Sequence, residues 1–238
     1  MSSIRAILFD LDDTLFDHRR SARAALLQVH RVHAPGFDFD AFERHHARYL
    51  EEMHLEVLAG RVGLDDARRE RFRRVFAALG VALAADVVDA VASAYRDGYM
   101  TSRRALDGAP ELLAVLKPAA RIAIVTNNLL DEQQDKLRYC GLAPFVDVLV
   151  ASEDVGVSKP ARGIFEIALA RAGVPAESAV MVGDSWANDI QGARRAGIAA
   201  VWFNPERLPQ PSTEQGVTEI DSLTPATDVA RVLLERLS

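Results

Sequence analysis

The chain of 238 residues has little cysteine and little lysine, and both shortages are informative. Cys140 is the only cysteine, so no intramolecular disulfide can form and we expect a reducing compartment, the cytoplasm. Of the 28 basic residues only three are lysines, Lys117, Lys136 and Lys159, which leaves 25 arginines. Because arginine fills almost every basic position, a lysine is informative: its compact ammonium enters a tight site that the wide guanidinium cannot, and Lys159 is a candidate for such a site.

The sequence also lacks long apolar runs and an excess of positive charge. Asp10 interrupts the apolar N-terminal run too early for a signal peptide, and no later run approaches membrane-spanning length. The formal charge is −6 and the pI is about 5.5. Nucleic-acid polymers are bound through clustered Lys and Arg, so we expect neither a nucleic acid nor a membrane as partner.

Downstream of residue 105, short apolar runs alternate with segments of helical periodicity. Together with the N-terminal run, the predicted strands cover residues 4–9, 121–125, 146–151, 179–182 and 199–203. The predicted helices cover residues 132–139, 163–172, 187–196 and, after a loop with three prolines, 226–237. This alternation predicts an α/β protein with a doubly wound, Rossmann-like parallel sheet of about five strands.

The segment between the first strand and residue 105 has a different pattern. Apolar residues recur at helical spacing there, which predicts helices near 42–53, 72–79 and 87–95. Asp65 and Asp66 suit the start of the middle helix, because acids stabilise the positive end of its dipole. We therefore expect an all-helical domain, residues 17–105, inserted into a core formed by residues 1–16 and 106–238.

Polar residues follow the predicted strands at four places, where single occurrences usually mean turns or caps. They are Asp10 and Asp12, Thr126, Lys159, and Asp184 with Asp189. Parallel strands of one sheet end at a single edge, so these side chains should converge there. Several carboxylates at such short distances from one another repel unless a cation lies between them. Oxygen ligands without a Cys/His set favour Mg²⁺ over Zn²⁺.

Four segments of the chain resemble, in order, the four motifs of the haloacid dehalogenase-like hydrolases. They are Asp10-Leu11-Asp12-Asp13-Thr14, then Thr126, then Lys159, and finally Gly183-Asp184 with Asp189. The resemblance implies that Asp10 attacks a phosphomonoester and forms an aspartyl-phosphate. It implies that Asp12 protonates the leaving oxygen and then activates the hydrolytic water.

The resemblance also assigns the groups around the phosphate. Thr126 and the amide of Asn127 would bind phosphoryl oxygens, and Lys159 would offset their charge. In this family the metal ligands would be Asp10, the backbone carbonyl of Asp12 and Asp184. Asp189 would orient the metal shell or Lys159.

More than a hundred residues separate the first motif from Thr126. This early insert resembles that of the helical-cap (C1) phosphatase branch of the family. His18, Arg19 and Arg20 follow the first motif and could face the substrate; a solvated helix start is the alternative. Residues 152–160 look closest to nucleoside 5′-monophosphatases and phosphoglycolate phosphatases. We expect a Mg²⁺-dependent phosphatase for a small phosphorylated metabolite, with nucleoside 5′-monophosphates considered first, acting as a monomer or homodimer.

Other activities within the family can be compared by their chemistry. A dehalogenase needs no acid to protonate an alkoxide, so Asp12 favours a phosphatase. A phosphonatase uses a cap lysine, and no lysine precedes Lys117. A phosphosugar mutase on the same core stays open, and so does a non-catalytic binding or regulatory module, although none of the four motifs is broken.

Overall fold

The computed structural model describes residues 5–211 and 216–235. The chain divides into two compact units, one formed by Met1–Asp17 with Arg104–Ser238 and the other by His18–Arg103. Among the described residues, no helix combines the length and the apolar character needed to cross a bilayer.

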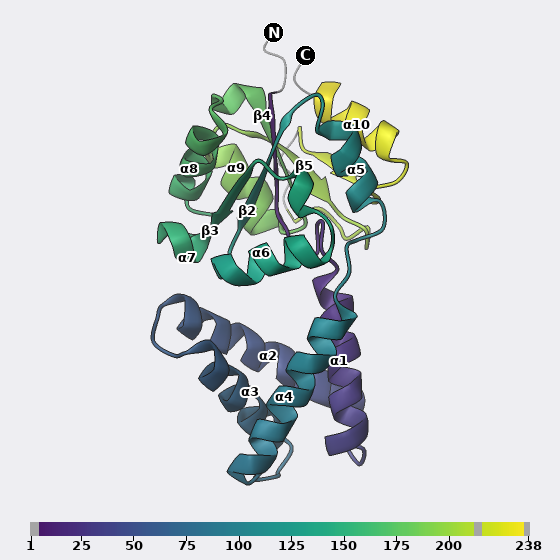
Figure 1. Ribbon diagram of the computed structural model, residues 1–238, viewed down its shortest axis with the longest axis vertical. Helices are drawn as coiled ribbons and strands as arrows, with labels where there is room; N and C mark the ends of the chain where they lie inside the picture. Colours follow the sequence, from purple (N-terminus) through teal and green to yellow (C-terminus); the bar gives the residue numbers. More distant parts are fainter. Residues whose placement is uncertain (1–4, 212–215, 236–238) are drawn as a thin grey trace. The chain divides into compact units, whose positions relative to one another are not determined.

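In its described residues the first unit is built on six parallel strands, ordered β3-β2-β1-β4-β5-β6 (Figure 1). The strands are β1 (Ala6–Phe9), β2 (Arg121–Thr126), β3 (Val148–Ala151), β4 (Ala179–Gly183), β5 (Ala199–Phe203) and β6 (Thr218–Ile220). The predicted α/β class with a parallel sheet and a helical insert is confirmed. The estimate of five strands was one too few, because β6 has only three residues, Thr-Glu-Ile, and no apolar run.

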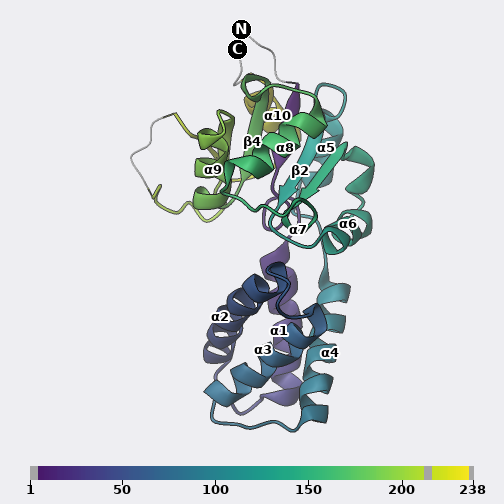
Figure 2. The ribbon, with the colours of Figure 1, turned by 90° about the vertical axis from the view of Figure 1, so that its left-hand side faces the viewer.

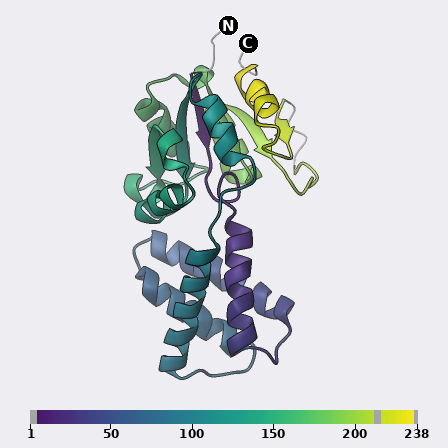
Figure 3. The ribbon, with the colours of Figure 1, turned by 45° about the vertical axis from the view of Figure 1, so that its right-hand side comes forward.

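Helices cover both faces of this sheet, as a doubly wound fold requires. They are α5 (Ala109–Leu116), α6 (Leu130–Tyr139), α7 (Ser152–Val155), α8 (Arg162–Ala172), α9 (Gln191–Arg195) and α10 (Ala226–Glu235). Figure 1 shows α8 and α9 on one side of the sheet, and Figure 3 shows α5 beside α10 on the other. Because both faces are covered, β1 is buried along its whole length and its sequence is continuously apolar.

Several boundaries predicted from the sequence differ from the structure. The strand predicted from residue 146 begins at Val148, and the Asp147 carboxylate just before it accepts a hydrogen bond from the Ile122 amide. The helix predicted over 187–196 is divided into a π-helical turn, Trp186–Ile190, and α9. Residue 4 of the first predicted strand, residues 212–215 of the proline-containing loop and residues 236–237 of the last helix lie outside the described residues.

The second unit contains four helices, which Figure 2 shows without intervening strands. They are α1 (His18–His33), α2 (Phe39–Leu58), α3 (Leu64–Ala78) and α4 (Ala85–Ser102). The three helices predicted by periodicity correspond to α2, α3 and α4, and Asp65 and Asp66 lie in the first turn of α3 as predicted. Phe42, Phe72 and Tyr95 from these helices share one apolar core with residues of α1.

The strand order determines where a ligand can bind in the first unit. From the central β1, the chain adds β2 and β3 on one side and β4 to β6 on the other. In such sheets the crevice lies outside the carboxyl ends of the strands where the order reverses. The polar residues that follow β1, β2 and β4 therefore lie at the expected position for a ligand site.

Candidate active site

Asp10 follows β1 directly and is held in the sheet. Its amide donates to the Val182 carbonyl of β4 at 2.9 Å, and only 7% of the residue is exposed. The chain then turns sharply, with Asp13 at a positive φ of 62° and its amide bonded to the Phe16 carbonyl at 2.7 Å. The turn fixes Thr14, whose hydroxyl accepts the Asp184 amide at 3.1 Å. Thr14 thus links the end of β1 to the end of β4.

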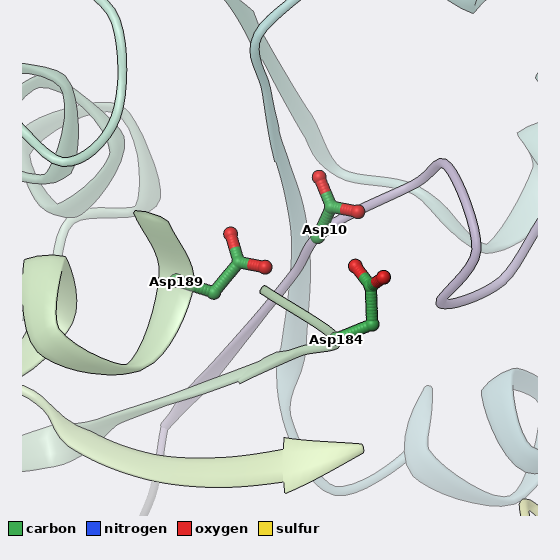
Figure 4. Close-up of side chains that lie close together, drawn as sticks. All are labelled: Asp10, Asp184 and Asp189. Atoms are coloured by element: carbon green, nitrogen blue, oxygen red, sulfur yellow. The ribbon is translucent and has the colours of Figure 1, made fainter. Parts of the chain in front are cut away.

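Three carboxylates meet at this edge of the sheet, those of Asp10, Asp184 and Asp189. Figure 4 shows their side chains pointing toward one another, and one oxygen of each lies within 4.8 Å of the others. Asp10 comes from the end of β1, Asp184 follows β4, and Asp189 lies in the π-helical turn. Asp10 and Asp189 are buried and Asp184 is partly exposed. The carboxylate of Asp12 is not one of this group.

Lys159 lies between two of the three carboxylates. Its ammonium is 2.6 Å from Asp10 Oδ1 and 2.6 Å from Asp189 Oδ1, and the lysine is 5% exposed. Burial would lower the pKa of the Lys159 ammonium, but the charges of Asp10 and Asp189 outweigh it and the net shift is upward. Lys159 is therefore a permanent cation in this environment.

The pKa of Asp10 is shifted by opposing effects. Burial raises it well above its ordinary value, Lys159 opposes that rise, and the neighbouring Asp189 and Asp184 add to it. When all are ionised, three carboxylates and one ammonium leave an excess of two negative charges in the cluster. A bound cation would offset this excess and favour the ionised form of Asp10.

The loops that present Lys159 and Asp189 are fixed by local contacts. The side-chain amide of Asn127 accepts from the Lys159 amide at 2.7 Å and donates to the Lys159 carbonyl at 2.8 Å. Asp189 accepts the Ser185 amide at 3.0 Å. A Cβ on Gly183 would lie 2.4 Å from the carboxyl group of Asp189, so only glycine fits beneath it. These contacts explain two residues of the motifs, Asn127 and Gly183, by geometry.

Thr126 ends β2 and is 2% exposed. Its hydroxyl oxygen accepts from the side chain of Gln133 at 2.8 Å. β2 lies beside β1, with Ile124 level with Phe9, so Thr126 lies at the same edge of the sheet as Asp10. The predicted phosphate-binding hydroxyl and the predicted nucleophile thus come from the ends of neighbouring strands.

The carboxylate of Asp12 has partners that the sequence did not reveal. Lys136 lies 2.6 Å from its Oδ1, while Gln133 and Asn128 donate to its Oδ2 at 3.0 and 3.2 Å. Of these, Lys136 could have been noticed in the sequence, because it is one of three lysines in a chain with 25 arginines. Gln133 and Asn128 carried no such signal, because polar residues of helices and loops usually face solvent.

The remaining predicted residues, His18, Arg19 and Arg20, lie in the first turn of α1, in the helical unit. The His18 ring is hydrogen-bonded to the Tyr99 hydroxyl at 2.9 Å, whereas Arg19 and Arg20 are exposed. The His18 ring therefore has a fixed partner within its own unit.

The three-carboxylate cluster has the chemistry of a divalent-cation site. It offers oxygen ligands only, in a number that leaves room for water and a phosphate oxygen, as Mg²⁺ prefers. Because Lys159 already pairs with Asp10 and Asp189, the ligands best placed for an ion are the remaining oxygens of Asp10 and Asp184. The residues present therefore fit magnesium.

Comparison with known proteins gives a consistent result. The sequence profile of the haloacid dehalogenase-like hydrolases matches residues 4–197. The ribulose-1,5-bisphosphate 5-phosphatase of Halopiger xanaduensis is 34% identical over 94% of this chain and 98% of its own. The pyrimidine 5′-nucleotidase YjjG of Escherichia coli is 45% identical over 44% of this chain and 48% of its own.

A solved structure also matches along the whole chain. The HAD hydrolase YfnB of Bacillus subtilis, solved bound to magnesium, superposes with a TM-score of 0.76. It is 25% identical, over 98% of this chain and 99% of its own.

Proposed function

This chain belongs to the haloacid dehalogenase-like hydrolase family, and we propose that it is a Mg²⁺-dependent phosphatase that hydrolyses small phosphomonoesters through an aspartyl-phosphate. The observation that carries the proposal is the cluster of Asp10, Asp184, Asp189 and Lys159 at the switch point of the sheet. In this proposal the cluster supplies a nucleophilic carboxylate, the metal ligands and a cation at one point of the sheet edge.

In the first half-reaction, an oxygen of Asp10 attacks phosphorus in line, and the bond between phosphorus and the leaving oxygen breaks. Asp12 gives its proton to that oxygen, so the product leaves as an alcohol. Thr126 and the backbone amide of Asn127 donate to the phosphoryl oxygens, and the Lys159 ammonium offsets their negative charge.

In the second half-reaction, water attacks the phosphorus of the aspartyl-phosphate. Asp12, now a carboxylate, accepts a proton from the water, inorganic phosphate leaves and Asp10 is regenerated. Asp10 and Asp184, with Asp189 beside them, would hold Mg²⁺, which would reduce the repulsion between the Asp10 carboxylate and the phosphate dianion.

Nucleoside 5′-monophosphates are the first substrates to consider, as residues 152–160 suggested and as the name of the Escherichia coli relative supports. Sugar phosphates are the second, because a relative that matches over 94% of this chain is named for its action on ribulose-1,5-bisphosphate. In this proposal the helical unit selects among substrates, and His18, Arg19 and Arg20 contribute contacts to them. Substitution of Arg19 or Arg20 by alanine should then raise KM more than it lowers kcat.

A direct test incubates the protein with Mg²⁺ and a panel of phosphomonoesters that includes pyrimidine nucleotides and sugar phosphates, and measures released phosphate. Phosphate release by the wild type, with loss of at least about 10⁴-fold in Asp10→Asn, supports the proposal. Isomerisation of a sugar phosphate without release would favour a mutase. No turnover of any compound would favour a binding module.

A second variant separates the roles of the two motif-one aspartates. Asp12→Asn should slow turnover and leave Mg²⁺ binding largely intact, because the Asp12 carboxylate lies outside the metal-binding cluster. Complete loss of Mg²⁺ binding in a titration of this variant would contradict that division of roles.

A further inference from the structure

We infer that α6 carries a positioning pair, Gln133 and Lys136, which fixes the side chain of Asp12 and the hydroxyl of Thr126 for the reaction proposed above. The inference rests on that proposed function. The two residues lie three positions apart, so they share one face of the helix. Both side chains point toward the catalytic edge of the sheet, where their partners are Asp12 and Thr126.

Lys136 provides the first contact. The residue is 4% exposed, and its ammonium lies 2.6 Å from Asp12 Oδ1 and 5.0 Å from the centre of the Phe16 ring. A buried ammonium is costly unless it is paired, so a lysine kept here indicates a requirement beyond packing. Its compact charge holds one oxygen of Asp12 at a defined place.

Gln133 provides the second contact and joins two functional groups. The residue is fully buried, and its Nε2 lies 3.0 Å from Asp12 Oδ2 and 2.8 Å from Thr126 Oγ1. A carboxylate only accepts hydrogen bonds, which assigns the amide nitrogen to the side facing Asp12. The second N–H of the same group then goes to the oxygen of Thr126.

This arrangement determines the direction of the Thr126 hydroxyl. Because its oxygen accepts from Gln133, its own hydrogen is left to be donated elsewhere. A phosphoryl oxygen at the edge of the sheet is a suitable acceptor. Gln133 thereby makes Thr126 a donor toward the substrate while it restrains Asp12 with the same nitrogen.

Neither Gln133 nor Lys136 is required to touch the reacting atoms, so both would act through Asp12 and Thr126. The pair restrains both oxygens of Asp12, with Asn128 as a third donor to Oδ2 at 3.2 Å. A carboxyl group that must give a proton to the leaving oxygen as the acid, and later take one from water as the carboxylate, needs one stable position for both steps. Loss of the pair should therefore affect the steps that depend on proton transfer.

The experiment compares two substrates with different needs for protonation, in the presence of Mg²⁺. An alkyl phosphate, such as a nucleoside 5′-monophosphate that the wild type hydrolyses, needs a proton on its leaving oxygen. p-Nitrophenyl phosphate does not, because nitrophenolate is a stable anion. The variants are Lys136→Met and Gln133→Leu. Lys117→Met is the matched control, because Lys117 also pairs with a carboxylate at 2.6 Å, that of Asp147, in a more exposed position.

With the alkyl phosphate, kcat of both variants should fall about 10- to 100-fold. With p-nitrophenyl phosphate, the first turnover should stay fast and release a burst of about one nitrophenolate per active site. A slow steady state should follow, because hydrolysis of the aspartyl-phosphate still depends on Asp12. Gln133→Leu should in addition raise KM, since the Thr126 hydroxyl loses its direction, whereas Lys136→Met should leave KM nearly unchanged.

Equal losses on both substrates without a burst would indicate a purely structural role and overturn the inference. Variants that behave like Lys117→Met, or that are faster than the wild type, would overturn it as well. If Lys136→Met does not fold, Lys136→Arg keeps the charge, and its wider planar group should displace Asp12 and produce the same burst. A wild type that releases no phosphate would instead overturn the proposed function, and this inference with it.

Discussion

In the α/β unit the buried Lys159 lies between two carboxylates at 2.6 Å, whereas in the helical unit the buried His46 and Arg71 lie against aromatic rings. The His46 ring is 4.9 Å from that of Tyr95, and the Arg71 guanidinium is 4.8 Å from the same ring. The first unit therefore concentrates like charges in its interior. The second places its buried polar groups within an aromatic core.

The ion pairs of the two units also differ in range along the chain. Lys159 and Asp10 are 149 residues apart, and Lys136 and Asp12 are 124 apart. In the helical unit several pairs, such as Asp65 with Arg68 and Glu70 with Arg73, join exposed or partly exposed residues one helical turn apart. Like charges brought together at a sheet edge lower the stability of the fold. Such a cluster therefore indicates a functional site. Local pairs on a helix surface serve solubility and add little stability.

Apart from the loss expected in Asp10→Asn, the largest effect that distinguishes the units should come from Lys159→Met. This substitution removes the cation between Asp10 and Asp189, so kcat should fall about 10²- to 10³-fold. Phosphate release at saturating Mg²⁺ and substrate measures it. Lys117→Met serves as the control and should keep wild-type activity. Unchanged turnover in Lys159→Met would show that its charge is not used in catalysis.

A smaller effect is expected from Mg²⁺ on stability. At about 100 times its Kd, the ion should stabilise the α/β unit by about 2–3 kcal/mol, because it binds the folded cluster and not the unfolded chain. Urea unfolding with and without Mg²⁺ measures this, and removal by EDTA should reverse it. Asp184→Asn should lose most of the response. An equal response in that variant would contradict Asp184 as a ligand.

In the helical unit, the expected effect is a dependence of stability on pH that arises from His46. Burial, followed by the charges of Arg71 and His18, lowers the pKa of His46 well below 6.5 in the folded state. Below about pH 6.5 the unfolded chain therefore binds a proton that the folded chain does not, and stability falls as the pH falls. The contribution is fully present above pH 6.5, and its loss should reach about 1–2 kcal/mol near pH 5.

The variant His46→Phe tests this without disturbing the aromatic packing. Its free energy of unfolding should change less than that of the wild type between pH 7 and pH 5. His45→Gln, at the neighbouring and less buried position, should keep the wild-type slope. Parallel curves for the wild type and His46→Phe would show that His46 is not the origin of the dependence.

The smallest effect is expected at the surface of α3. Asp65 pairs with Arg68 at 2.9 Å with 68% of its side chain exposed, so Asp65→Asn should change the free energy of unfolding by less than about 1 kcal/mol. Phosphatase activity should be unchanged. The same Asp-to-Asn change at Asp10 should abolish it, which makes the two variants a matched pair. A large loss of activity in Asp65→Asn would remove the distinction between the units.

Much of this protein could be inferred from the order of its residues. The apolar strands are short and continuous because both faces of the sheet are covered, and that local signal located five of the six strands. The family resemblance, carried by the run from Asp10 to Thr14 and by Thr126, Lys159 and Asp184, is confirmed by the family match. The three-residue β6 was missed because its pairing with β5, rather than its composition, makes it a strand.

The sequence by itself determined which residues carry charge at the strand ends, since those positions follow local apolar runs. Only the tertiary structure decided how the charges pair, because partners from 30 to 149 residues apart meet only through the folded sheet. It set Lys159 between Asp10 and Asp189, and it turned Gln133 and Lys136 toward Asp12. The periodicity of a sequence identifies a helix and its apolar face. It does not identify the hydrogen-bond partner of a buried polar residue, because that partner lies elsewhere in the chain.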